Sequence, residues 1–233
     1  IGSNAAIAAM AGGLAGAAYT HDGTAYGAVA ADIRSSYFRA MATAGLEARW
    51  PILFSTSSAT HVLEPMAQLF VRPDVAYGST LGIPNEDAQS LVFDASTLFE
   101  RDKFSGYDLI ESGTRANLGL RYSASFANGW TANAIVGQSY HLAGRNPFAA
   151  PELVNVGAYS GLETDVSDVV AMAGFTSPGG VTFTAGGRFD EQTLEVRRAE
   201  ASVSIPIDRH SINASYTFIQ AQPLYGFSQD RRE

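Results

Sequence analysis

The side chains in this sequence that are best suited to chemistry are spaced in a way that argues against an enzyme or a metal site. The four histidines stand far apart, with no HxxH or HExxH spacing among them, although such spacings are the usual signature of zinc ligands. Ser139 and His141 stand two residues apart, but a serine nucleophile also needs a third group to orient the histidine, and none is evident. We therefore predict no catalytic residue, no metal site and no cofactor.

Charged and amide side chains recur instead on one face of several predicted strands. An arginine guanidinium can donate two parallel hydrogen bonds to a phosphate or a carboxylate, so some of these residues are candidates for contact with an anionic partner. The alternative is that they are solvated or pair with one another. These candidates are Glu64, Gln68, Arg115, Arg121, Arg188, Arg198 and Glu200.

The clearest element that would position such residues is a hairpin over residues 114–141. Apolar side chains such as Leu118 and Leu120 alternate with polar ones such as Arg115 and Asn117, and a period of two is that of a strand. Asn128-Gly129 predicts a tight turn between the arms. Each arm is long enough for a tilted membrane strand, which takes about 9–11 residues, whereas soluble strands average about 5–6. The hairpin alone is compatible with a membrane barrel or a soluble sandwich.

The same alternation predicts about ten strands in all, joined by two long loops and several short turns. Counting the strands alternately up and down places the loops near 74–112 and 143–165 at one end and the short turns at the other. Outer-membrane barrels have this asymmetry. Pro65 predicts an irregularity within its strand, and residues 87–99 a short helical turn. The other predicted strands are a Gly/Ala-rich strand within residues 1–19 and residues 24–38, 40–50, 61–72, 166–176, 181–190, 194–205 and 211–220.

The composition favours a surface that faces lipid on one side and water on the other. Only 16% of the 233 residues are charged, against about 25% in a typical soluble domain. A net charge of −8 without a basic run argues against a nucleic-acid partner. There is no cysteine, and therefore no disulfide or thiolate metal site in this stretch. The fold class that we predict is all-β, a transmembrane antiparallel β-barrel.

Three segments carry a family resemblance: residues 61–68 before the longer loop, residues 83–87 inside it, and residues 104–108 just before the 115–119 segment. Together they resemble the LptD family of lipopolysaccharide-assembly outer-membrane proteins, also called organic-solvent-tolerance proteins, in its alphaproteobacterial form. The resemblance covers roughly residues 40–233, and the loop segments are its most specific part. The residues of this cap-loop motif are Asn85, Glu86, Asp87, Phe104, Ser105, Gly106, Tyr107 and Asp108.

The resemblance implies that residues 1–233 are part of the C-terminal transmembrane domain, a barrel of about 26 strands, in the outer membrane of a Gram-negative cell. Such a barrel receives lipopolysaccharide from periplasmic bridge proteins and delivers it to the outer leaflet, with an LptE-like plug lipoprotein in its lumen. The bridge contacts belong to an N-terminal domain that we do not find in this chain. The charged end at residues 229–233 also predicts that more of the barrel lies outside it.

The function implied is a non-enzymatic lipopolysaccharide translocon, in which some of the inward-facing charges contact the plug or a lipid phosphate. The main alternative is a self-contained, porin-like diffusion channel of about ten strands. A third class, a soluble adhesin-like sandwich, predicts solubility without detergent. The partners expected for the translocon are lipopolysaccharide, the plug, the bridge proteins and outer-membrane lipids.

Overall fold

The computed structural model describes residues 16–19, 25–29, 40–74, 91–104, 106, 109–149, 159–223 and 226–233. Within these residues the chain is all-β and contains no α-helix, which confirms the predicted class. A search of the same residues for a helix able to cross a membrane finds none that is long and apolar enough.

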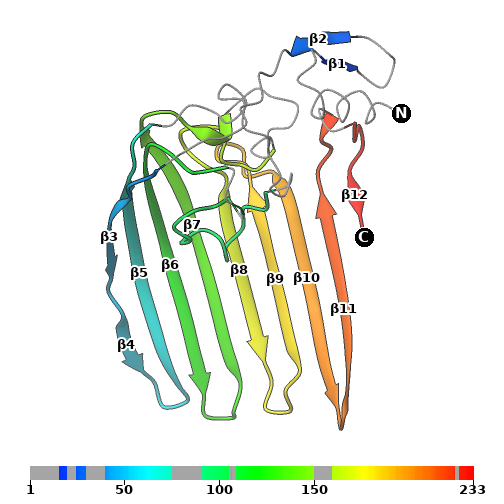
Figure 1. Ribbon diagram of the computed structural model, residues 1–233. Helices are drawn as coiled ribbons and strands as arrows, with labels where there is room; N and C mark the ends of the chain where they lie inside the picture. The colour runs from blue at the N-terminus through cyan, green and yellow to red at the C-terminus, as the bar shows by residue number, and fades with distance from the viewer. Residues whose placement is uncertain are drawn as a thin grey trace.

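Ten strands form one antiparallel sheet in the order β12-β11-β10-β9-β8-β7-β6-β5-β3, with β4 also paired to β5 (Figure 1). Almost every strand therefore lies beside its neighbour in sequence, as in an up-and-down meander. The strands are β3 (Ala44–Arg49), β4 (Ile52–Ser55), β5 (Ala59–Val71), β6 (Thr114–Phe126), β7 (Thr131–Ala143), β8 (Val169–Thr176), β9 (Thr182–Phe189), β10 (Val196–Ile207), β11 (His210–Ile219) and β12 (Arg231–Arg232).

The beginning of the chain forms a separate two-stranded sheet, in which β1 (Gly16–Tyr19) pairs with β2 (Ala25–Val29). The strand predicted over residues 24–38 thus coincides with β2 at its start, and its remainder, residues 30–38, lies outside the described residues.

The hairpin of β6 and β7 confirms the predicted alternation. The two strands pair from Ser125 and Thr131, next to the turn, along their length. In the turn Gly129 takes a φ of +84°, where a residue without Cβ is favoured. Leu118 is 47% exposed on one face, whereas Arg115 is 1% exposed on the other. We call the face that carries Arg115 the inner face and the opposite one the outer face.

The strand around Pro65 corrects one prediction, because the irregularity lies in its neighbour. The β5–β6 register runs without a shift through Pro65. On the other side, Pro51 separates β3 from β4, which both pair with β5, and Trp50 N donates to Pro65 O. In a strand, the N–H and C=O of one residue point to the same side. The hydrogen bond that Pro65 cannot donate is therefore lost only toward β3 and β4.

The turn between β10 and β11 is shorter than the gap between the predicted strands 194–205 and 211–220, because Pro206 and Ile207 remain in β10 and Asp208 turns the chain with a φ of 52°. The described part of residues 87–99, where a short helical turn is predicted, forms a hydrogen-bonded turn over residues 95–99. It follows Asp94, whose Oδ1 accepts hydrogen bonds from the backbone N–H groups of Ser96 and Thr97.

The short connections β4–β5, β6–β7, β8–β9 and β10–β11 lie at one end of the sheet, and the long β5–β6 and β7–β8 connections start from the other (Figure 1). The described parts of these long connections fold onto the inner face. We call them the cap: residues 91–104, 106, 109–113, 144–149 and 159–168. The core lies between cap and sheet, where Phe93, Leu98, Phe104, Phe148 and Leu162 pack on Ile135 and Val170.

Candidate functional site

A buried ion cluster fastens the cap to the sheet. Glu111, just before β6, is fully buried and its Oε1 lies 2.6 Å from Nε of Arg115 and 3.7 Å from Nη1 of Arg72. Arg115 also donates to Ser139 Oγ and to Asn146 Oδ1, each at 3.2 Å, and its guanidinium lies over the Phe148 ring. One arginine of the sheet thus binds three parts of the protein, two of them in the cap.

An amide and hydroxyl layer continues the cluster across the inner face. Asn117 and Ser139 are both fully buried, and Ser139 Oγ donates to Asn117 Oδ1 at 2.7 Å. Asn117 in turn donates to Gln68 Oε1 at 3.2 Å, and Gln68 donates to the Phe99 carbonyl of the cap. The buried polar groups are therefore largely hydrogen-bonded, which is the condition for burying them without a large energetic penalty.

Lys103 brings a third cation into this layer from the cap. Its side chain is buried, and its Nζ makes one long hydrogen bond of 3.4 Å to Asn117 Oδ1. Burial lowers the pKa of Lys103 to about 8, an effect that the nearby Glu111 carboxylate opposes. Among the described residues no carboxylate forms an ion pair with Lys103. An unpaired buried ammonium is costly, so Lys103 is a weak point of the cap.

Stability should therefore rise with pH in a window set by Lys103. Its pKa is about 8 in the folded protein against 10.5 for the free side chain, so the unfolded state binds more protons between these values, and the free energy of unfolding increases there. We expect a gain on the order of 2 kcal/mol, measured by urea unfolding in detergent from pH 7.5 to 10.5. Lys103→Met should abolish this rise; an unchanged rise would contradict the assignment.

Two glycines of the inner face make room for the cap. Gly119 and Gly137 pair across β6 and β7. An added Cβ at Gly137 would lie 2.5 Å from Leu98 Cδ2, and one at Gly119 would lie 2.9 Å from Phe99 Cζ. Both distances are too short for real carbon contacts, so the cap packs directly on the backbone of these strands.

Gly137→Ala should therefore loosen the cap and also strain the β6–β7 pairing, because the new methyl group would lie 2.3 Å from the Leu118 carbonyl oxygen of β6. Because the new methyl group must displace Leu98, we expect a cost of about 1–3 kcal/mol and faster hydrogen exchange in residues 91–104. Gly186→Ala is the matched control on the inner face of β9, where the nearest atom to a new Cβ is the Ala171 carbonyl oxygen at 3.2 Å. Equal exchange in both variants would argue against this packing.

A second arginine holds the later part of the cap. Arg188 Nε lies 3.0 Å from Asp168 Oδ2, and its Nη atoms donate to the carbonyls of Ser160 and Tyr159. Burial raises the pKa of Asp168 to about 6, although Arg188 acts in the opposite direction. This pair fixes the cap to β9 much as Glu111 and Arg115 fix it to β6.

Asp168, Asp190 and Glu191 bring carboxylate oxygens within 4.8 Å of one another among the described residues. Both aspartates already have cationic partners, since Asp190 pairs with Arg197 and also accepts from the N–H groups of Gln192 and Thr193. These contacts hold the pKa of Asp190 below its usual range. The carboxylates of this group therefore stabilise the connection between β9 and β10 through ion pairs.

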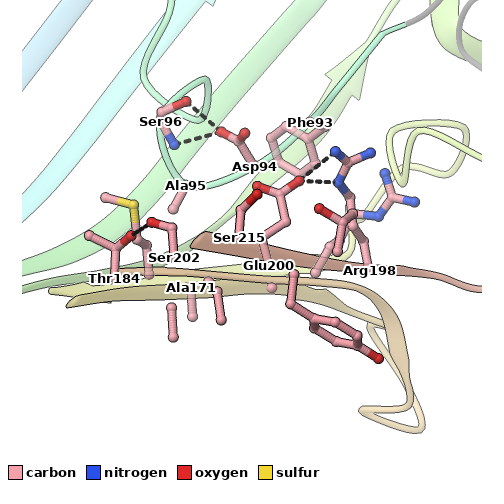
Figure 2. Close-up of a pocket in the computed structure, with 18 residues that line it drawn as sticks. Phe93, Asp94, Ala95, Ser96, Ala171, Thr184, Arg198, Glu200, Ser202 and Ser215 are labelled. Carbon is pink, nitrogen blue, oxygen red and sulfur yellow. Dashed lines mark hydrogen bonds and ion pairs between the residues drawn. The ribbon is translucent and has the colours of Figure 1, made fainter. Parts of the chain in front are cut away.

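A cleft of about 320 Å³ lies between the Asp94–Ser96 turn of the cap and the inner face of β9, β10 and β11. Figure 2 shows Thr184, Ser202 and Ser215 rising from the strands toward this turn, beside the pair of Arg198 and Glu200. Arg198 Nε donates to Glu200 Oε1 at 2.6 Å. The cleft thus offers hydroxyl, guanidinium and carboxylate groups together.

The seven predicted candidates fall into separate parts of the inner face. Gln68, Arg115 and Arg188 are buried in contacts with the cap. Glu64 and Arg121 pair across β5 and β6 at 3.7 Å, and Arg198 and Glu200 line the cleft. Only the last two pairs keep groups within reach of solvent.

A comparison with protein-family models matches residues 12–232 to "LptD: LPS transport system D". The chain belongs to the LptD family. This family acts in lipopolysaccharide transport to the outer membrane, and it is a transport family rather than an enzyme family. Comparison with the curated proteins finds no match.

Of the motif that carries the LptD resemblance, the structure describes two residues. Phe104 is buried and stacks on Phe148 with ring centroids 4.6 Å apart, and Gly106 is half-buried. The other motif residues lie outside the described part of the chain: Asn85, Glu86, Asp87, Ser105, Tyr107 and Asp108.

Ser139 and His141, the nearest approach to a catalytic pair in the sequence, have separate structural partners in this LptD-family chain. Ser139 Oγ bonds with Asn117 and Arg115, and His141 Nε2 lies 3.0 Å from the Gly144 carbonyl oxygen. Sequence reasoning did not find Glu111, Lys103 or Asp168. One signal was present, because Glu111 precedes Arg115 by four residues at the loop–strand boundary.

Proposed function

We propose that this sheet is part of the wall of an outer-membrane translocon that inserts lipopolysaccharide into the outer leaflet without catalysing a reaction. The observation that carries the proposal is the opposite character of the two faces. Leu118, Leu120 and Phe183 are exposed on the outer face, where hydrocarbon would cover them. The inner face is apolar where the cap packs on Ile135 and Val170, and beyond the cap it is largely polar, so that this part would receive the sugar portion of the lipid.

The proposal assigns the cap to the extracellular end, as in barrels with long outer loops and short periplasmic turns. A cap fixed at Arg115 and Arg188 would close the lumen above this part of the wall until lipopolysaccharide arrives. The remaining strands, the periplasmic bridge and an LptE-like plug would be supplied by the rest of the protein and by its partners. Of the seven predicted candidates, Glu64, Arg121, Arg198 and Glu200 are still accessible to such partners.

Depletion of the full-length protein in cells tests this function against a diffusion channel. For a translocon, lipopolysaccharide should disappear from the cell surface and accumulate before the outer membrane, while uptake of small solutes through other porins continues. Surface lipopolysaccharide at its normal level together with reduced solute uptake would instead identify a channel.

A further inference from the structure

The cleft beneath the Asp94–Ser96 turn has a regular polar floor. Thr184 pairs with Ser202, and Ser202 pairs with Ser215, so three strands present hydroxyls in one row across the sheet. The Thr184 and Ser202 oxygens lie 2.6 Å apart. In the next row, Glu200 stands between Gly186 and Thr217. Because glycine has no side chain, the space beside the Glu200 carboxylate is open on the side of Gly186. Neighbouring strands are about 4.8 Å apart, so this floor is a fixed grid of hydrogen-bonding groups.

The charge of the cleft is balanced. Arg198 is paired with Glu200, and Arg188, the other cation that lines it, is paired with Asp168. A phosphate site would need an excess of positive charge, and the described lining has none. Glu200 can accept hydrogen bonds from two neighbouring hydroxyls while Arg198 donates to others, since a side-chain carboxylate has about four lone-pair positions.

The size of the cleft also limits its ligand. A volume of about 320 Å³ lies at the lower end of the range of about 300–1,000 Å³ for small-molecule pockets, which suits a small saccharide but not a whole glycolipid. Ala95 and Met172 add an apolar edge between the cap turn and β8, which suits the C–H face of a sugar ring.

We propose that this cleft binds a saccharide unit, held by the hydroxyl row of Thr184, Ser202 and Ser215 and by the Arg198–Glu200 pair. The source of the saccharide rests on the proposed function: it is the sugar portion of lipopolysaccharide as it moves along the inner face. The cap turn contributes Asp94 and Ser96 to the opposite side of the ligand.

The test uses the full-length protein in detergent and the core oligosaccharide of lipopolysaccharide, freed of its lipid by mild acid hydrolysis. Isothermal titration calorimetry should detect binding to the natural protein. Ser202→Phe, which fills the cleft, should weaken binding at least about tenfold. Val203→Phe is the matched control, because it adds the same ring one residue later on the outer face, and it should leave binding unchanged. Thr184→Ala with Ser202→Ala, which removes two hydrogen bonds without adding bulk, should weaken binding about tenfold.

Three results would overturn the proposal. They are the absence of oligosaccharide binding to the natural protein, equal binding by the Ser202→Phe and Val203→Phe proteins, and displacement of the oligosaccharide by inorganic phosphate at similar concentrations. The last result would identify an anion site instead. The outcome is separable from the proposed function: if the Ser202→Phe protein does not lose oligosaccharide binding but its depletion still blocks surface lipopolysaccharide, only the cleft assignment fails.

Discussion

Arg115→Ala should destabilise the protein by about 3–5 kcal/mol, the cost typical of breaking a buried ion pair from one side. The substitution leaves the Glu111 carboxylate fully buried, and among the described residues Arg72 at 3.7 Å is its one remaining ion-pair partner. It also removes the donors to Ser139 and Asn146 and the contact with Phe148. Equilibrium urea unfolding of the protein folded in detergent measures the loss.

Arg121→Ala is the control for this prediction, because Arg121 is on the same strand and faces the same way. Its side chain is 45% exposed and lies 3.7 Å from Glu64, so its removal should cost less than about 1 kcal/mol. The double variant Glu111→Gln, Arg115→Met should be more stable than Arg115→Ala, since no unpaired carboxylate remains. Equal losses for Arg115→Ala and Arg121→Ala would contradict the role of the cluster.

Leu118→Arg should cost about 2–4 kcal/mol if the outer face lies in the membrane near its midplane. Leu118 is in the middle of β6, between Ala67 of β5 and Gln138 of β7, and it is 47% exposed. An arginine at so exposed a position would be harmless in water, but in hydrocarbon its guanidinium loses its hydration. The loss is measured by unfolding of the protein inserted in lipid vesicles.

The matched substitution is Ser123→Arg, which places the same side chain on the inner face of the same strand. Ser123 is exposed there, so the new guanidinium would remain hydrated and the cost should be far smaller. If both arginines cost the same, the two faces of β6 do not differ in environment, and the assignment of the outer face to lipid is wrong.

The strands were predictable because apolar and polar side chains alternate along each of them, with a period of two residues. Over β6, Leu118 lies on the exposed outer face and Asn117 in the buried polar layer of the inner face, and apolar and polar side chains alternate in this way along the strand. The turn at Asn128-Gly129 carries its own local signal. Both kinds of information lie within a few residues of sequence.

The cap was not predictable in the same way, because its contacts join residues far apart in sequence. Lys103 meets Asn117, and Asp168 meets Arg188 across 20 residues of strand and turn. No period marks such pairs. The packing of Leu98 and Phe99 on Gly119 and Gly137 was not predictable either. A glycine in a strand indicates that some group approaches the backbone closely, but not which group.

Pro65 shows how a correct rule gave a wrong location. Proline cannot donate to a ladder, and the sequence alone does not say toward which neighbour the missing N–H would point. The structure places it toward Trp50 and Pro51, so the interruption falls between β3 and β4 and leaves the β5–β6 ladder intact.

The cap covers the inner face unevenly, and this has a consequence for movement along the wall. It buries inner-face side chains from β5 to β9, among them Met66, Ile135 and Arg188, whereas Ser202 on β10 and Ser215 on β11 stay exposed. If this sheet lines a translocon as proposed, a molecule that moves along its inner face would pass over β10 and β11, beside the cap. A plug protein in the same lumen would then have to contact other strands to leave this path open.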